Sequence, residues 1–238
     1  MRLHLLGVNG PFPEPRGACS GYLLEAGGFL LQFDLGTGVL SSLTALTAPE
    51  ALDAIFLSHW HFDHTSDLLP LIYRLQALKA VLRIYAPVDE SSPVRDIVLH
   101  SDCFELHDIA PGDTVSMGDI SVTAGRAVHP VPAVMYKVSA EGRVFCYTGD
   151  TNLFPGLPDF LRGTDTLLAD ALFTCALWSA EKPHLSASLA AELAADAGVS
   201  RLILTHLNPS IPVETLIREA REHFANVQPA SAGMMIDL

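Results

Sequence analysis

The chain has 238 residues, of which 49% are hydrophobic and 17% are charged, a composition typical of globular domains and unlike that of disordered chains. Acidic residues outnumber basic residues by 27 to 14, which gives a net charge of −13. Because such a surface repels phosphate backbones at long range, an extended nucleic acid is not expected as a partner. No apolar stretch reaches the roughly 18 residues that a membrane span needs, so no membrane partner is expected either.

The four cysteines, at positions 19, 103, 146 and 175, form no CxxC pair and have irregular spacings. This pattern predicts reduced thiols and a cytoplasmic protein. The first apolar run is interrupted at Gly7, which is too early for a secretory signal peptide. Cys146 and Cys175 lie in apolar runs, and we expect both to be buried in the core.

Short apolar runs alternate with turn residues through the first 90 residues or so, which is typical of strands. The pattern predicts a hairpin turn at Gly27-Gly28 and an apolar run over 54–58 that ends at a group of histidines. It predicts a helix over 68–78 and strands over 3–6, 21–25, 29–33 and 80–85.

The second half contains another strand-rich block with a turn at Glu141-Gly142, followed by helical segments. Apolar residues at helical spacing predict a helix over 213–224, and an Ala-rich helix over 188–197 ends before Gly198. Strands are predicted over 115–117, 120–124, 134–138, 144–147, 166–169 and 201–205. Two β-rich blocks, each followed by helices, predict one α+β domain over 1–238, a four-layer αββα sandwich.

The strongest motif is Ser58-His59-Trp60-His61-Phe62-Asp63-His64, which places four potential metal ligands just after an apolar strand. Imidazole suits zinc and other late divalent ions, and a carboxylate can bind a metal or hold a water molecule. A tight loop here can direct His59 and His61 toward one ion and Asp63 and His64 toward a neighbouring one. A simple surface loop is the alternative, but such loops rarely contain three histidines and an aspartate.

Three further candidate ligands, His129, Asp150 and His206, each follow a predicted strand. Taken singly, each is weak, because His129 resembles a structural histidine and Asp150 a turn residue. Their shared position at strand ends supports a common metal site.

The segment SHWHFDH resembles the HxHxDH signature of the metallo-β-lactamase superfamily, and Asp34, His129, Asp150 and His206 resemble its other motifs in order. The resemblance implies two divalent metal ions, with zinc favoured and manganese or iron as alternatives, and it implies a homodimer. It assigns one ion to His59, His61 and His129, a second to Asp63, His64 and His206, and Asp150 to both ions. It also implies that Asp34 is a buried supporting residue, although a turn or capping role fits the sequence equally well.

Two such ions about 3.5–4 Å apart can share a hydroxide that attacks phosphorus or a carbonyl carbon. Asp63 is a candidate to orient this nucleophile or to accept its proton. These features predict a metal-dependent hydrolase.

Two other segments resemble ribonuclease Z, namely 167–173 with Asp170 and 184–186 with His184. The resemblance implies that His184 is a general acid oriented by Asp170. The alternatives are a capping or salt-bridge role for Asp170 and a surface role for His184. Because this chain has an aspartate where ribonuclease Z has a glutamate, the distance between the two groups is an open question.

Only twenty residues separate His129 from Asp150, which leaves no room for the long arm that grips transfer RNA in ribonuclease Z. We therefore expect a small phosphodiester or cyclic nucleotide as the substrate. Transfer-RNA 3′ processing and hydrolysis of a carboxyl ester, lactone or thioester are the alternatives, and the latter would not need Asp170 and His184. A binding protein without chemistry is disfavoured because the ligand set is complete.

Overall fold

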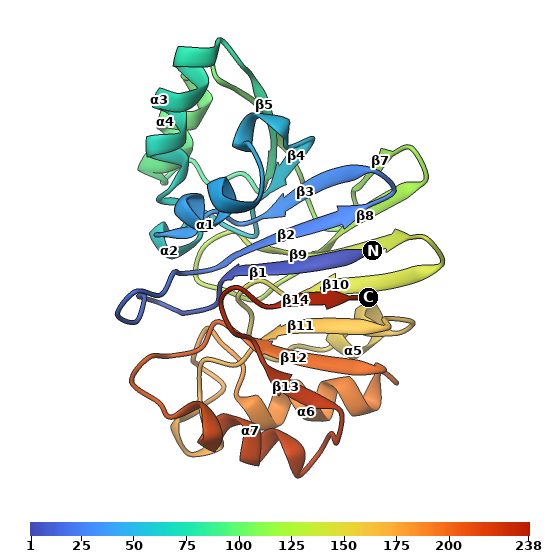
Figure 1. Cartoon of the computed structure of the whole chain (residues 1–238). Helices are drawn as coiled ribbons and strands as arrows, with labels where there is room; N and C mark the ends of the chain where they lie inside the picture. Colours follow the sequence, from blue (N-terminus) through green and yellow to red (C-terminus); the bar gives the residue numbers. More distant parts are fainter.

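The computed structural model describes residues 1–238 and contains two seven-stranded sheets that pack face to face (Figure 1). The first sheet has the order β14-β1-β2-β3-β4-β5-β6 and the second the order β13-β12-β11-β10-β9-β8-β7. The strands of the first sheet are β1 (Arg2–Gly7), β2 (Gly21–Ala26), β3 (Phe29–Phe33), β4 (Ala54–Phe56), β5 (Leu82–Ala86), β6 (Phe104–Asp108) and β14 (Met235–Asp237). Those of the second are β7 (Thr114–Met117), β8 (Ile120–Arg126), β9 (Val134–Ala140), β10 (Arg143–Tyr147), β11 (Thr166–Asp170), β12 (Arg201–Thr205) and β13 (Val227–Pro229).

Both sheets change from antiparallel to parallel pairing partway across. Strands β14, β1, β2 and β3 are antiparallel, and β3 to β6 are parallel. In the same way, β7 to β10 are antiparallel and β10 to β13 are parallel. The predicted turns at Gly27-Gly28 and Glu141-Gly142 join β2 to β3 and β9 to β10, and all four residues have positive φ, as such tight turns require.

Side chains along each inner strand alternate between two apolar cores. On β12, Ile203 points between the sheets, whereas Leu202 and Leu204 point toward the outer helices. On β4, Phe56 points between the sheets and Ile55 points outward. Because both faces of these parallel strands are covered, their sequences are continuous apolar runs without polar alternation.

Helices cover the outer face of each sheet and complete four layers, as Figure 1 shows. The predicted αββα sandwich is confirmed. The first sheet is covered by α1 (Val39–Leu46), α3 (Leu68–Leu78) and α4 (Pro93–Leu99), with η1 (Pro49–Ala51) and the short α2 (Phe62–Thr65) nearby. The second sheet is covered by α5 (Leu157–Leu161), α6 (Ala187–Asp196) and α7 (Val213–Arg221). The short helix η2 (Cys175–Leu177) lies in the loop between β11 and α6.

The predicted strands and helices occur within a few residues of their expected bounds. The edge strands β6, β13 and β14 and the helices α1, α2, α4 and α5 were not predicted. Cys146 is buried as expected. The prediction for Cys175 was wrong: it is exposed, because it begins η2 in the loop after β11 and does not continue a buried strand. No helix is long and apolar enough to cross a membrane.

Candidate metal centre

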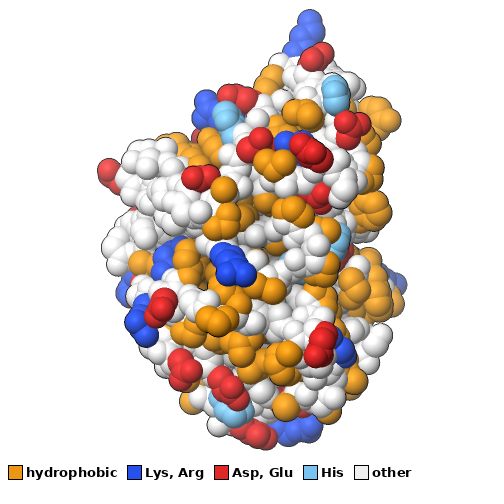
Figure 2. Space-filling view, turned by 180° about the vertical axis from the view of Figure 1, so that it is seen from behind, with side chains coloured by type: hydrophobic (Ala, Val, Ile, Leu, Met, Phe, Trp, Pro, Cys, Tyr) orange, Lys and Arg blue, Asp and Glu red, His pale blue; other side chains and the backbone are white.

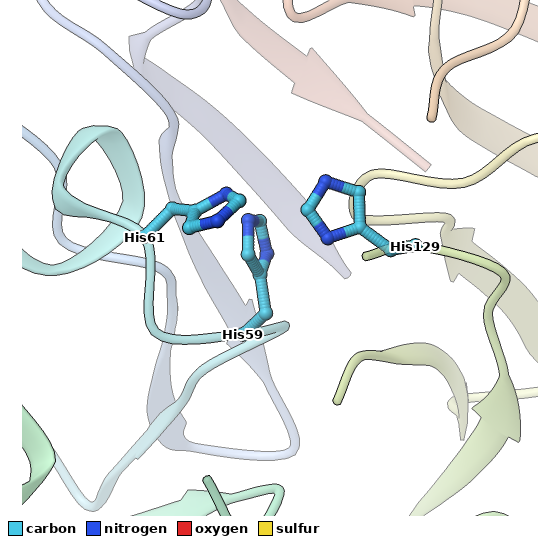
Figure 3. Close-up of side chains that lie close together, drawn as sticks. All are labelled: His59, His61 and His129. Atoms are coloured by element: carbon cyan, nitrogen blue, oxygen red, sulfur yellow. The ribbon is translucent and has the colours of Figure 1, made fainter. Parts of the chain in front are cut away.

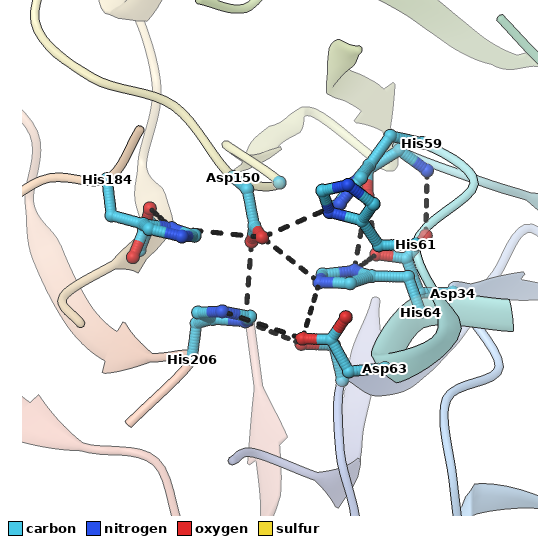
Figure 4. Close-up of polar contacts among 12 residues, drawn as sticks. Asp34, His59, His61, Asp63, His64, Asp150, His184 and His206 are labelled. Carbon is cyan, nitrogen blue, oxygen red and sulfur yellow. Dashed lines mark hydrogen bonds and ion pairs between the residues drawn. The ribbon is translucent and has the colours of Figure 1, made fainter. Parts of the chain in front are cut away.

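The seven side chains predicted as metal ligands lie together at one edge of the sandwich, where several strands end. Figure 4 labels all of them except His129, which Figure 3 shows. These side chains follow β4, β8, β10 and β12, so both sheets contribute. Carboxyl ends of neighbouring parallel strands meet at one edge of a sheet, which explains why segments distant in sequence converge here. The seven residues are His59, His61, Asp63, His64, His129, Asp150 and His206.

The local conformation after β4 divides the HxHxDH motif into two parts. His61 has extended dihedral angles (φ −65°, ψ 153°) and precedes the first residue of α2. His59 and His61 are two residues apart in this extended segment, a spacing that places side chains on one side. Asp63 and His64 instead lie within α2, so the helical turn directs them toward a different position.

His59, His61 and His129 form what we call the trihistidine cluster, which Figure 3 shows with the three rings facing a common centre. Their ring centroids are 4.6 to 4.9 Å apart. His59 is buried, His129 is partly buried and His61 is exposed. The cluster therefore has an open side toward solvent.

The second group, which we call the mixed cluster, contains Asp63, His64, Asp150 and His206. Oδ2 of Asp150 lies 3.2 Å from Nε2 of His64 and 3.6 Å from Nε2 of His59. Asp150 therefore stands between the two clusters, where the resemblance placed a ligand shared by both ions. Oδ2 of Asp63 lies 3.6 Å from Nε2 of His64 and 3.8 Å from Nε2 of His206.

Several atoms in the two clusters are buried without any hydrogen-bond partner, a costly arrangement that proteins normally avoid. Of the nine such side-chain atoms in the molecule, five belong to these residues. A cation at each cluster would satisfy them, so the residues present fit a metal centre. The five atoms are Nε2 of His59, Nε2 of His64, Nδ1 of His129, Oδ1 of Asp150 and Nε2 of His206.

Asp34 is fully buried and fixes the orientation of the ligand loop, which excludes a simple turn or capping role. Its carboxylate accepts hydrogen bonds from the Ser58 backbone N–H (2.7 Å), the Ser58 hydroxyl (2.8 Å) and the Tyr147 hydroxyl (2.6 Å). Nδ1 of His64 lies 2.8 Å from Oδ2 of Asp34. A proton on this Nδ1 leaves Nε2 of His64 free to bind a metal, the usual role of a carboxylate behind a ligating histidine.

Two hydroxyl groups play the same role for other histidines. Nδ1 of His59 lies 3.0 Å from the Ser58 hydroxyl, and Nδ1 of His206 lies 3.2 Å from the Ser20 hydroxyl. In His59, Nε2 is therefore the nitrogen that faces the cluster. In His206, Nδ1 also lies 3.3 Å from Oδ1 of Asp150, and Nε2 lies 3.8 Å from Oδ2 of Asp63.

Burial lowers the pKa of His59 and His206, and it lowers the pKa of His129 to about 4. A lowered pKa favours the neutral ring, which can offer a lone pair to a cation. Burial acts in the opposite sense on Asp150, but its pKa lies well below the usual range because neighbouring histidines, led by His206, stabilise the carboxylate. Burial alone would lower the pKa of His64, but Asp150, Asp63 and Asp34 raise it well above its usual value.

The predicted pair of Asp170 and His184 is formed, with Oδ2 of Asp170 lying 2.9 Å from Nδ1 of His184. Asp170 is the last residue of β11, and the loop that follows it forms a β-bridge between Phe173 and Ser186. Because this bridge holds the neighbouring His184 close to the end of β11, the shorter aspartate side chain reaches it. The His184 ring stacks on His206 with centroids 5.1 Å apart. Burial alone would lower the pKa of His184, but the carboxylates of Asp170 and Asp150 raise it to about 9, and burial raises the pKa of Asp170 to about 6.

Sequence reasoning missed some residues that hold this arrangement in place. The Asn152 amide donates to the carbonyls of Ser179, Ala180 and Lys182 and so fixes the loop before His184. Gly10 packs directly against His206, since a Cβ at this position would lie 2.1 Å from Nε2 of the ring. The sequence shows two glycines, Gly7 and Gly10, close together near the chain start, but it does not show that Gly10 contacts His206.

Comparison with known proteins decides the family. A family model for the beta-lactamase superfamily domain matches residues 33–207, which include all seven predicted ligands. The chain belongs to this superfamily. Its fold is accordingly the metallo-β-lactamase fold, and it carries a His/Asp cluster able to bind metal.

Relatives within the beta-lactamase superfamily cover nearly the whole chain. An uncharacterised protein of Mycobacterium tuberculosis is 32% identical over 238 residues, covering 94% of this chain and 87% of that protein. The probable metallo-hydrolase YhfI of Bacillus subtilis is 28% identical with 99% of both chains covered, and its crystal structure matches with a TM-score of 0.93 over 99% of this chain and 98% of that one. A ribonuclease Z of Methanopyrus kandleri is 28% identical, covering 98% of this chain and 96% of that protein.

Proposed function

We propose that this protein is a phosphodiesterase that hydrolyses a small phosphodiester, such as a cyclic nucleotide, at a dinuclear metal centre. The proposal depends above all on the hydrogen bond between Asp170 and His184 beside Asp150. A carboxyl ester, lactone or thioester hydrolase would need the metal ligands but not this pair. The ribonuclease Z from Methanopyrus kandleri, a relative named for phosphodiester cleavage, also supports this branch.

In this proposal, His59, His61 and His129 would hold one cation, Asp63, His64 and His206 would hold the other, and Asp150 would be available to both. The histidine-rich donor set favours zinc, with manganese or iron as alternatives. Two divalent cations here would lower the pKa of a water molecule and supply positive charge beside the reacting phosphorus.

His184 has the geometry of a proton donor to the leaving group. Because its Nδ1 contacts Asp170, the opposite nitrogen, Nε2, has no partner in the protein and is free to face a substrate oxygen. Stacking on His206 holds the ring beside the mixed cluster. Asp63 is only partly buried, and in this proposal it would orient the attacking water or accept its proton.

A compact substrate fits the rest of the molecule better than transfer RNA. Between His129 and Asp150 the chain forms only the hairpin of β9 and β10, with the tight turn Glu141-Gly142. No arm projects from this position. On the face seen in Figure 2, Lys and Arg side chains occur in small separate groups, not as one broad basic patch of the kind that nucleic-acid binding requires.

The first test compares hydrolysis of bis(p-nitrophenyl) phosphate, a carboxyl ester and a lactone, with metal content measured on the same sample. We expect turnover of the phosphodiester with about two metal ions per chain. Turnover of the ester or lactone alone would reject the phosphodiesterase proposal and return Asp170 and His184 to structural roles.

The role of His184 is tested by His184→Ala. Loss of a general acid costs about 10²–10⁴-fold, and the cost should appear mainly with poor leaving groups. We expect a large loss of turnover for a phenyl diester, a much smaller loss for the p-nitrophenyl diester, and unchanged metal content. His223→Ala, at an exposed histidine on the surface, is the matched control. Equal slowing of both substrates would remove His184 from this role.

A further inference from the structure

A cavity of about 570 Å³ lies beside the trihistidine cluster and shares His129 with it. Its size falls within the range of small-molecule sites. Of its thirteen lining residues, only Arg126 and His129 have polar side chains, and the other eleven are Ala, Val, Ile or Pro. The walls come from residues 87–88, 109–111, 126–127 and 129–134.

Arg126 is exposed at this cavity, and it forms none of the ion pairs that most arginines of this chain form. Its guanidinium makes no ion pair and no side-chain hydrogen bond, although the chain has 27 acidic residues. It lies 5.3 Å from the centroid of the Phe154 ring, a cation–π contact that restrains it. No Asp or Glu lines the cavity, so the positive charge of Arg126 is available to a ligand.

The walls of the cavity suit an apolar, flat group. Four of the lining residues are prolines, whose rings are rigid and whose nitrogens carry no hydrogen to donate. Burial of an apolar ring against them needs little reordering of side chains. The four prolines are Pro87, Pro111, Pro130 and Pro132.

We propose that this cavity binds the organic substituent of the substrate, and that this substituent is an apolar, ring-containing group with its own anionic group, which pairs with Arg126. Such a substrate is a small phosphodiester with a second anionic group, which a simple cyclic nucleotide lacks. The reacting phosphate then lies at the trihistidine cluster, the apolar body lies along the proline walls, and the second anion lies at the guanidinium. The inference rests on the proposed function for the position of the phosphate. Arginine is suited to this role because its fork of N–H donors matches carboxylate and phosphate oxygens.

The test measures binding and not turnover, by titration calorimetry on the protein as purified with its metals. The probes are methylphosphonate, phenylphosphonate and carboxyphenylphosphonate, which add first the ring and then the second anion. We expect affinity to rise at each step. A charge-assisted contact of this kind corresponds to about tenfold or more in affinity.

Arg126→Gln should lower the affinity for carboxyphenylphosphonate by about tenfold and leave phenylphosphonate binding unchanged. Val131→Asp, which places a charge on the apolar wall, should weaken both ring-containing probes but not methylphosphonate. Arg218→Gln, on the exposed face of α7, is the matched control for charge and should change none of the three. If Arg126→Gln changes all three probes equally, or none of them, the proposal is rejected.

Failure of this inference can be distinguished from failure of the proposed function. Hydrolysis of bis(p-nitrophenyl) phosphate without any effect of Arg126→Gln on carboxyphenylphosphonate binding would reject the cavity and keep the phosphodiesterase. Arg126-dependent binding in a protein that hydrolyses only carboxyl esters would keep the cavity as an anion-selective site and reject the phosphodiesterase.

Discussion

The trihistidine and mixed clusters are adjacent but are built in different ways. The trihistidine cluster has no carboxylate of its own, and its His61 is exposed to solvent. The mixed cluster contains two carboxylates, and three of its four members are at most 2% exposed. Hydrogen bonds to Asp34 and Ser20 fix two of its imidazoles, whereas His61 has no side-chain partner behind it.

This difference predicts that the two clusters hold a cation with different strength. Buried carboxylates attract a divalent ion strongly because little water screens them. Fixed imidazoles lose little conformational entropy when they bind. We therefore expect the mixed cluster to retain its metal longer, and the trihistidine cluster, which adjoins the 570 Å³ cavity, to exchange metal and meet substrate more readily.

The largest effect is expected from Asp150→Ala, because Asp150 is the residue that contacts both clusters. Loss of a residue that hydrogen-bonds a metal ligand costs about 10–100-fold in metal affinity or activity. Loss of a ligand shared by two ions should therefore cost more than about 100-fold in activity. Both metals should be lost together, as measured by elemental analysis and phosphodiester turnover on one sample. Retention of full metal content would show that Asp150 is not a shared ligand.

An intermediate effect is expected from His61→Ala, which should empty the trihistidine cluster alone. The variant should retain about one metal ion per chain and lose most of its activity, because both ions contribute to the reaction. Metal counting, together with the rate of metal release to a chelator, tests this. His100→Ala, at an exposed histidine remote from the site, is the control. Loss of both metals from His61→Ala would contradict the difference between the clusters.

The smallest of these effects is expected from Asp34→Asn, which keeps the shape of the side chain but removes the charge behind His64. The affinity of the mixed cluster should fall by about 10–100-fold, more than that of the trihistidine cluster. A chelator competition titration measures both. Asp53→Asn is the control, since Asp53 also accepts a backbone hydrogen bond but lies away from the site. Equal weakening of both clusters would indicate that Asp34 supports the loop as a whole.

Much of the candidate site is visible in the sequence because its residues follow strands that are recognisable as apolar runs. His59, Asp150 and His206 stand out for this reason. Ser20, Asn152 and Arg126 do not, because a serine, an asparagine or an arginine in a loop is ordinary by itself. Each becomes notable only through a neighbour distant in sequence: His206 for Ser20, the loop 179–182 for Asn152, and Phe154 for Arg126.

The strands of the fold were predictable to different degrees for a physical reason. Central strands such as β12 are covered on both faces, so burial demands a continuous apolar sequence. The edge strands β13 and β14 have three residues each and are partly exposed, and their pairing depends on the strand beside them. β14 pairs with β1 across almost the whole length of the chain, a contact that no local pattern can reveal.

The alternation of apolar runs and turns predicted the four-layer architecture, and the polar residues that follow the predicted strands indicated the candidate ligands, because both patterns are local properties of the chain. The tertiary structure was needed to show that Asp34 lies directly behind His64 and that Asp170 reaches His184. It also decided that Arg126 faces an apolar cavity beside His129. These features depend on distances between segments far apart in the chain, which are fixed by the packing of two sheets and not by any local pattern.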